Sequence, residues 1–435
     1  MTRELQKKPK VKLNVNTDAE KNEKANLDPP EDKFYIIYVL FFLLGLVQIL
    51  PWTFFNNANG FWMYKFRNTT INETDSEFRT DLQAQFNAAI MITLQVSQVA
   101  FLIIGLLFGR FIKVRVRFIG ILAIIVLLFI ILTAFVKIDT DSWQEGFFAM
   151  VLAITFTINS LNSVFTITIY TAISNFPHHY LAPYLAGCGI STTFTALLQL
   201  LSLATGLSVE DSALVYFLLG AFVVGFTLTF VAITTGRNQF YLYYMKNYTT
   251  DQEEKRVGFR EGVRLFKKVW SCIAMMGLFM FTTNMSPTTL VVSEGEGNGP
   301  WNDKYFVPTI TFLLYALCDL LGRTLSFRFA PKNLPGFGWV FVAFVRAVVI
   351  FPLLMLCNLQ PRHNLPVLLP HDYQYILIMI AGATSGGYIV SRSTYNIASL
   401  VKPEELKDAY HVQMLCIGVE IGILSFLTIV SVDIL

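Results

Sequence analysis

Two residues of opposite charge lie inside a long apolar stretch, and they are the clearest sign of chemistry in the sequence. Residues 305–329 read YFVPTITFLLYALCDLLGRTLSFRF, with Asp319 and Arg323 four positions apart. In a helix this spacing places both side chains on one face, where they can pair. A charge at bilayer depth costs from roughly 3 to more than about 10 kcal/mol, so such residues usually face a bundle interior or a water-filled path. The pair marks a candidate site, and a buried ion pair that only fixes helix packing is the alternative.

The composition predicts the setting of this pair. The chain has 435 residues, of which 54% are hydrophobic and 14% charged. This balance indicates an all-α membrane protein and not a soluble enzyme. A span needs roughly 20 apolar residues, and eleven transmembrane helices are expected, at 35–55, 86–109, 118–136, 147–173, 184–206, 213–235, 269–292, 306–329, 338–357, 374–399 and 410–435.

Charges in the loops predict the orientation. Lys and Arg gather in the N-terminal segment and after the second, sixth and eighth spans. The excess of basic residues marks the cytoplasmic side, so the N-terminus is expected inside and Leu435 outside. The first outer loop fits less well because it contains Lys65 and Arg67. It also carries two sequons, and we expect glycosylation at Asn68 and Asn72.

The spacing of the spans predicts the domain organisation. Residues 1–33 are polar and rich in Lys, as expected of a disordered cytoplasmic tail. Residues 34–236 are predicted to form a bundle of six helices, 237–268 a cytoplasmic loop, and 269–435 a bundle of five helices. This is a major-facilitator-like 6+5 arrangement, in which two halves rock about a site at the midplane.

Further polar side chains are expected inside the membrane. Gln95 and Gln98 share one face of the second span, and Asn162 and Thr166 share one face of the fourth. Amides can meet a heterocycle edge, or they can simply hold helices together. Trp52, directly after a proline, could anchor the helix at the interface or form a stacking wall for a planar ligand.

The sequence contains no sign of a primary pump or a metalloenzyme. It has no phosphate-binding glycine loop and no cluster of metal ligands, so we expect no cofactor, no metal and no enzymatic activity. The five cysteines lie in or near apolar segments, and no disulfide framework is expected.

Several motifs resemble one known family. The motifs are Gly45-x-x-x-x-Leu50-Pro51-Trp52-x-Phe54-Phe55, Phe86-Asn87, Asn159-Ser160, Pro177-x-x-Tyr180-x-Ala182-Pro183, Asp319-x-x-Gly322-Arg323, Arg346 with Pro352-Leu353-Leu354-x-Leu356-Cys357-Asn358, and Gly387-Tyr388. Their order and spacing across the spans are similar to those of the equilibrative nucleoside transporters. The resemblance implies eleven spans and facilitative transport of nucleosides by alternating access.

The resemblance also implies a set of site residues. It places Trp52 near the ligand, Asp319 and Arg323 on the ribose side, and Ile49 and Phe312 at apolar positions of a central cavity. Phe312 precedes Asp319 by seven residues, which is two turns of an α-helix.

The chain departs from the family pattern at several positions, including Ala316, Arg392 and Glu420, and four of the departures concern the base. Thr166 stands where better-known members have Gln, and Asn162 replaces a Gly. Gln95 and Gln98 stand where the pattern has Met and Leu. We therefore expect polar contacts to the base to have moved from the fourth span to the second.

The most direct interpretation is facilitative transport of purine and pyrimidine nucleosides, with nucleobases as further candidates, at the plasma membrane. The alternative is a proton-coupled symporter for nucleosides or nucleobases, with Asp319 or Glu420 as the proton site. Arg392 and Glu420 could pair across neighbouring helices. A receptor or structural membrane protein is a third hypothesis, against which the eleven spans and the paired charges argue.

Overall fold

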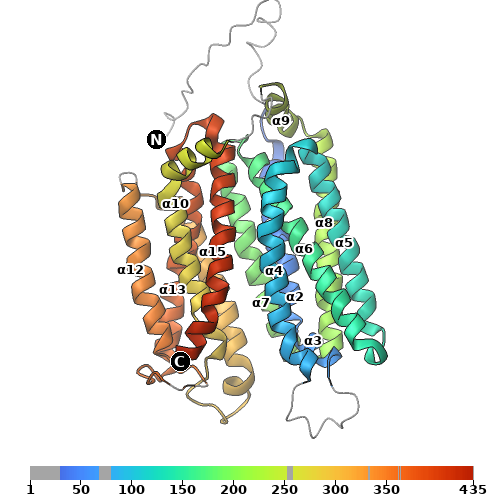
Figure 1. Ribbon diagram of the computed structural model, residues 1–435, viewed down its shortest axis with the longest axis vertical. Coiled ribbons are helices and arrows are strands. Elements are labelled where there is room, and N and C mark those ends of the chain that lie inside the picture. Colours follow the sequence, from blue (N-terminus) through green and yellow to red (C-terminus); the bar gives the residue numbers. More distant parts are fainter. Residues whose placement is uncertain are drawn as a thin grey trace, which may run out of the picture.

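The chain folds into a bundle of long helices (Figure 1). In this computed structural model the described residues are 30–67, 80–251, 258–331, 334–360, 362 and 364–434. Within these ranges the only β structure is two isolated bridges, so the prediction of an all-α protein is confirmed. Ten helices in the described ranges are long and apolar enough to cross a membrane. The eleventh predicted span matches helix α15, Leu406–Ile434, and its crossing of the membrane stays a prediction.

Helices from the first part of the chain pack together on one side of Figure 1. The strongest packing joins α2 to α7, α5 to α8 and α4 to α6. The long helices of this side are α2 (Ile36–Asn57), α4 (Asp81–Phe108), α5 (Val114–Lys137), α6 (Gln144–Ile173), α7 (Leu181–Thr205) and α8 (Val209–Arg237).

The remaining helices form the other side of the bundle (Figure 1). The eighth span is irregular, since its first part is a π-helix, η8, and only its second part is α-helical. The two sides meet where α7 packs on α11 and where α4 packs on α15. The elements of this side are α10 (Phe259–Met285), η8 (Val307–Leu314), α11 (Tyr315–Arg328), α12 (Gly336–Met355), α13 (Asp372–Tyr395) and α15.

Glycines allow two helix pairs to approach closely. A Cβ at Gly45 or Gly187 would lie 2.0 or 2.1 Å from a carbonyl oxygen of the facing helix in the α2–α7 pair. A Cβ at Gly322 or Gly387 would do the same, at 2.0 or 2.1 Å, in the α11–α13 pair. Small residues permit such contacts between helix backbones in membranes. These pairs hold the helices that carry the candidate site residues.

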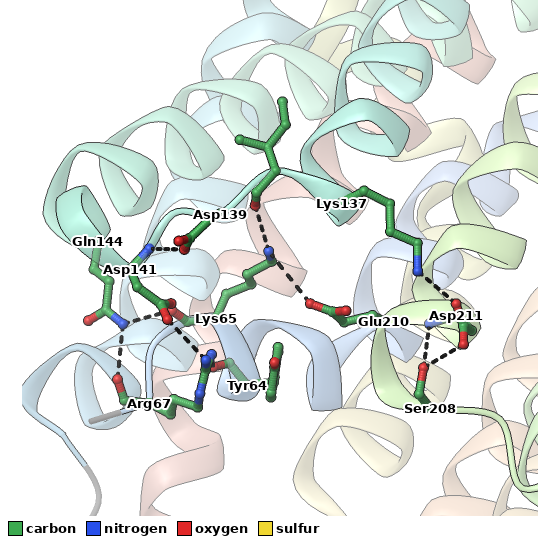
Figure 2. Close-up of polar contacts among 11 residues, drawn as sticks. Tyr64, Lys65, Arg67, Lys137, Asp139, Asp141, Gln144, Ser208, Glu210 and Asp211 are labelled. Carbon is green, nitrogen blue, oxygen red and sulfur yellow. Dashed lines mark hydrogen bonds and ion pairs between the residues drawn. The ribbon is translucent and has the colours of Figure 1, made fainter. Parts of the chain in front are cut away.

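A polar network at one end of the first side contains the basic residues of the first loop, which the charge pattern predicted to be outer. Lys65, at the end of α3 (Asn59–Lys65), donates to the Ile138 carbonyl oxygen at 2.9 Å and lies 3.9 Å from Glu210. Arg67 pairs with Asp141 at 3.0 Å (Figure 2). Lys65 and Arg67, which fit the charge rule poorly, therefore lie close to acidic residues at the beginnings of α8 and of the short helix Asp141–Trp143.

Two short helices were not predicted. α3 follows the first span, and α9 (Gln239–Asp251) occupies part of the segment predicted as the loop 237–268. The aromatic side chains of Phe240 and Tyr241 on α9 are buried and pack on Phe176. This packing stabilises α9, although the polar composition of the segment predicts a loop. The sequons at Asn68 and Asn72 and the tail 1–29 lie outside the described residues.

Candidate substrate site

The ion pair predicted from spacing is present in the structure. The Nε atom of Arg323 donates to Oδ2 of Asp319 at 2.6 Å, and both residues lie on α11. Asp319 is 3% exposed, and its other carboxylate oxygen, Oδ1, is buried with no hydrogen-bond partner in the described part of the chain. A carboxylate oxygen can accept from a hydroxyl group. The pair therefore keeps one strong acceptor for a ligand.

Arg323 lies at the interface between the two sides of the bundle. A Cβ at Gly189 of α7 would come within 3.0 Å of its Cδ atom. Gly189 therefore leaves the space that the Arg323 side chain occupies. An ion pair that only fixed packing within one side would not need this contact with the other.

A second polar cluster lies on the α7 side of that contact. Gln48 of α2 donates from Nε2 to the Thr166 hydroxyl of α6 at 2.8 Å. Its Oε1 atom accepts from the hydroxyl of Tyr184 and lies 3.6 Å from Sγ of Cys188, both on α7. Cys188 is the neighbour of Gly189 in the chain, so the Gln48 cluster and Arg323 meet at the same turn of α7.

Sequence reasoning did not assign Tyr184 and Cys188 to the site. Both are buried, at 2% and 7% exposure. Their spacing of four residues places them on one face of a helix, and the nearby glycines marked a close helix contact. Gln48 in the first span was a further signal, because a buried amide needs hydrogen-bond partners.

Trp52 and Ile49 are half-buried on α2 and pack against the main hydrophobic core of the bundle. Pro51 lies inside this helix. The indole N–H of Trp52 has no hydrogen-bond partner in the ranges the structure describes. Its role as a wall of the ligand site stays a prediction.

Trp52→Ala is expected to reduce nucleoside uptake and weaken substrate binding, with little change in surface level. The physical reason is the loss of a large flat apolar surface, since an aromatic pair contributes about 0.5–1.5 kcal/mol beyond its buried area. Uptake kinetics and surface labelling measure both quantities. Lower membrane insertion with unchanged affinity would instead identify Trp52 as an interfacial anchor.

The helical spacing expected for Phe312 is wrong. Phe312 lies in the π-helix η8, so counting two α-helical turns from Asp319 does not give its direction. It lines a cavity of about 190 Å³ within the second side, together with Tyr315 and Arg346. A contact of Phe312 with a central ligand stays a prediction.

The four polar site residues predicted on α4 and α6 are half-buried. Thr166 is engaged by Gln48, whereas Oδ1 of Asn162 is buried with no hydrogen-bond partner among the described residues. Gln95 and Gln98 are both half-buried on α4. Gln98 makes no hydrogen bond with any residue in the described ranges. A contact of these four residues with a ligand stays a prediction.

The structure does not bring Arg392 and Glu420 into an ion pair. Arg392 donates to Oδ1 of Asn396, directly after the end of α13, and its Cζ atom lies 5.3 Å from the ring centroid of Trp339. The Glu420 carboxylate lies instead against Gly277 of α10, where a Cβ would come within 3.0 Å of it. Sequence alone could not show that the two side chains point to different neighbours.

Comparison with known proteins identifies the family of the chain. The family model described as "Nucleoside transporter" matches residues 152–263 and 247–430. Equilibrative nucleoside transporter 1 of Rattus norvegicus is 28% identical over 454 residues, covering 92% of this chain and 98% of that protein. Equilibrative nucleoside transporter 2 of Homo sapiens is 26% identical, covering 93% and 99%. The solved structure of the human organic anion transporter MFSD10 (TETRAN) aligns over 92% and 94% of the two chains with a TM-score of 0.47 and 11% identity. The chain belongs to the nucleoside transporter family, as its resemblance to the equilibrative nucleoside transporters predicted.

Proposed function

We propose that this protein carries nucleosides across the membrane by facilitative diffusion and alternating access. The observation that supports this most is the buried polar path between the two sides, from the Asp319–Arg323 pair to Cys188 and Gln48. Sites of this kind at the contact between two halves are typical of secondary transporters.

The residues of the path suit the two parts of a nucleoside. Oδ1 of Asp319 can accept a hydrogen bond from a ribose hydroxyl, while Arg323 can only donate. Ile49 and Trp52 offer apolar surface for the flat base. A site that combines a few polar groups with apolar walls is the usual design for a small-molecule ligand.

Alternating access requires contacts that open and close at each end. At the end that carries the basic loops, Tyr170 of α6 packs on Tyr410 of α15 with ring centroids 5.1 Å apart. His178 packs on Tyr395 at 3.9 Å. These rings join the two sides, so this end is closed in the structure and the contacts must separate for release there.

Gln95→Met and Gln98→Leu are expected to change the ratio of purine to pyrimidine nucleoside uptake. These changes restore the apolar family pattern, and an unsatisfied polar group on the base costs about 1–3 kcal/mol. Gln48→Leu is the comparison, because its amide is already occupied and its loss should lower uptake of all nucleosides alike. An unchanged preference among the four common nucleosides, at normal surface level, would show that Gln95 and Gln98 serve only in helix packing.

We infer the remaining assignments from the charge pattern and the family. The basic end is taken as cytoplasmic, with the N-terminus inside, the C-terminus outside and the protein at the plasma membrane. Asn68 and Asn72 would then be exposed to glycosylation. The substrates include purine and pyrimidine nucleosides, with nucleobases as candidates.

Uptake measured with and without a proton gradient tests the mechanism. Because Asp319 is engaged by Arg323, a proton-coupled mechanism would have to use Glu420, whose Oε2 atom is buried with no partner in the described ranges. Facilitative transport predicts equal uptake in both conditions and no effect of Glu420→Gln on the gradient response. Accumulation above equilibrium that needs both the gradient and Glu420 would establish the symporter.

A further inference from the structure

A large cavity lies between the two sides at the basic end, away from the substrate site. Its volume is about 520 Å³, and its walls come from the end of α4, from α5 and α6, and from the beginnings of α10 and α15. It therefore spans the α4–α15 contact between the two sides. None of the residues assigned to the substrate site lines it.

The apolar wall of the cavity continues onto the outer surface of the bundle. Ile103 and Leu107 of α4 are 43% and 55% exposed, and Phe266 of α10 is 44% exposed. On a membrane protein such residues face lipid chains. The cavity is thus accessible from the bilayer, and an acyl chain can lie along this wall.

The described charged residues at the polar end of the cavity are mainly basic. Arg117 of α5 and Lys407 of α15 line it with one acid, Asp408. Arg117 is 7% exposed, and its guanidinium lies over Gly109, where a Cβ would come within 2.8 Å of Nη1. Among the described lining residues, lysine and arginine outnumber acidic side chains by two to one. Basic pockets between helices at the cytoplasmic side are suited to anionic headgroups.

The cavity also contains a contact between the two sides. The hydroxyl of Thr171 on α6 lies 3.0 Å from Nε2 of His411 on α15, and both residues line the cavity. This contact neighbours the Tyr170–Tyr410 pair in the chain. A ligand held by Arg117 of one side and Lys407 of the other would join the sides at the end that must open.

We propose that this cavity binds an anionic glycerophospholipid, with its headgroup phosphate at Arg117 and Lys407 and an acyl chain along Ile103, Leu107 and Phe266. The bound lipid stabilises the closed form of the basic end. A neutral or zwitterionic lipid supplies no net charge to match the cations, so it binds more weakly. The proposal concerns lipid binding and does not depend on which solute is carried.

Thermal unfolding of the purified full-length protein in detergent tests the proposal without any transport assay. Addition of dioleoylphosphatidylglycerol should raise the melting temperature of the wild type, and dioleoylphosphatidylcholine should raise it much less. Lys407 lies half-buried at the rim of the cavity. In the Lys407→Gln variant, the difference in melting temperature between the two lipids should fall by more than half. Lys113→Gln removes an exposed charge at the same end. This control variant should keep the full difference in melting temperature between the two lipids.

Two further arms complete the test. Leu107→Gln leaves the charges intact and should also reduce the response to the anionic lipid, because it adds a polar group to the acyl wall. Inorganic phosphate in place of the lipid should have no effect. Equal responses of wild type and Lys407→Gln, or the full response from phosphate alone, would overturn the assignment.

Discussion

Asp319→Ala and Arg323→Ala should each abolish nucleoside uptake. The two side chains bond at 2.6 Å and are almost fully buried, at 4% and 14% side-chain exposure. Removal of one partner leaves an uncompensated buried charge, which costs about 3–5 kcal/mol. It also removes either the acceptor or the donors proposed for the ribose. Radiolabelled uridine uptake and surface biotinylation, measured together, separate lost transport from lost protein.

The double variant Asp319→Ala/Arg323→Ala distinguishes a functional pair from a structural one. It leaves no unpaired charge, so surface level and stability should recover relative to the single variants, while uptake stays absent. The exposed pair Lys137–Asp211, at 2.8 Å, provides the control, since alanine at both positions should change neither the surface level nor the uptake. Recovery of uptake in the double variant would show that Asp319 and Arg323 only support packing.

Gly322→Ala and Gly387→Ala should prevent correct folding of the second side of the bundle. The added Cβ would lie 2.0 or 2.1 Å from a backbone carbonyl oxygen of the facing helix, and backbone cannot move as a side chain can. Overpacking of a core costs about 1–3 kcal/mol and occasionally more. The α11–α13 contact should therefore open, displacing the helix that carries Asp319. Fluorescence-detected size exclusion and thermal unfolding measure the loss of correctly folded protein.

Gly120→Ala is the matched control for these glycines. Gly120 lies within α5, and a Cβ there meets no atom within 4 Å. Replacing a helical glycine in open space should be neutral or stabilising, by about 0.5–1 kcal/mol. Normal folding of Gly322→Ala would show that α11 and α13 are further apart than in this structure.

Much of the architecture could be predicted because it follows from local patterns. Apolar stretches of span length gave the long helices, and the four-residue spacing of Asp319 and Arg323 gave their pairing. α9 was missed because its stability comes from Phe240 and Tyr241 packing on a distant loop, which no local pattern contains. The π-helical geometry at Phe312 was also missed, because the apolar pattern of the segment predicts a helix but not its hydrogen-bond spacing.

The candidate site was predictable only in part. Gln48 was visible as a polar residue in the first span, yet its partners Tyr184 and Cys188 lie more than one hundred positions away. Sequence spacing predicts contacts within a helix but not between helices, and the Arg392–Glu420 pair failed for this reason. The motifs shared with the family identified Asp319 and Arg323 but not the contact that joins them to α7.

Uridine equilibration by the purified protein in sealed liposomes tests the central claim most directly. The vesicles carry no ion or pH gradient, and radiolabelled uridine is added outside. Facilitative transport predicts rapid entry that stops when the internal and external concentrations are equal, and faster label exchange when unlabelled uridine is inside. Asp319→Ala protein should behave as empty liposomes do. Uridine entry no faster than in empty liposomes, from wild-type protein that is folded and correctly inserted, would contradict the account.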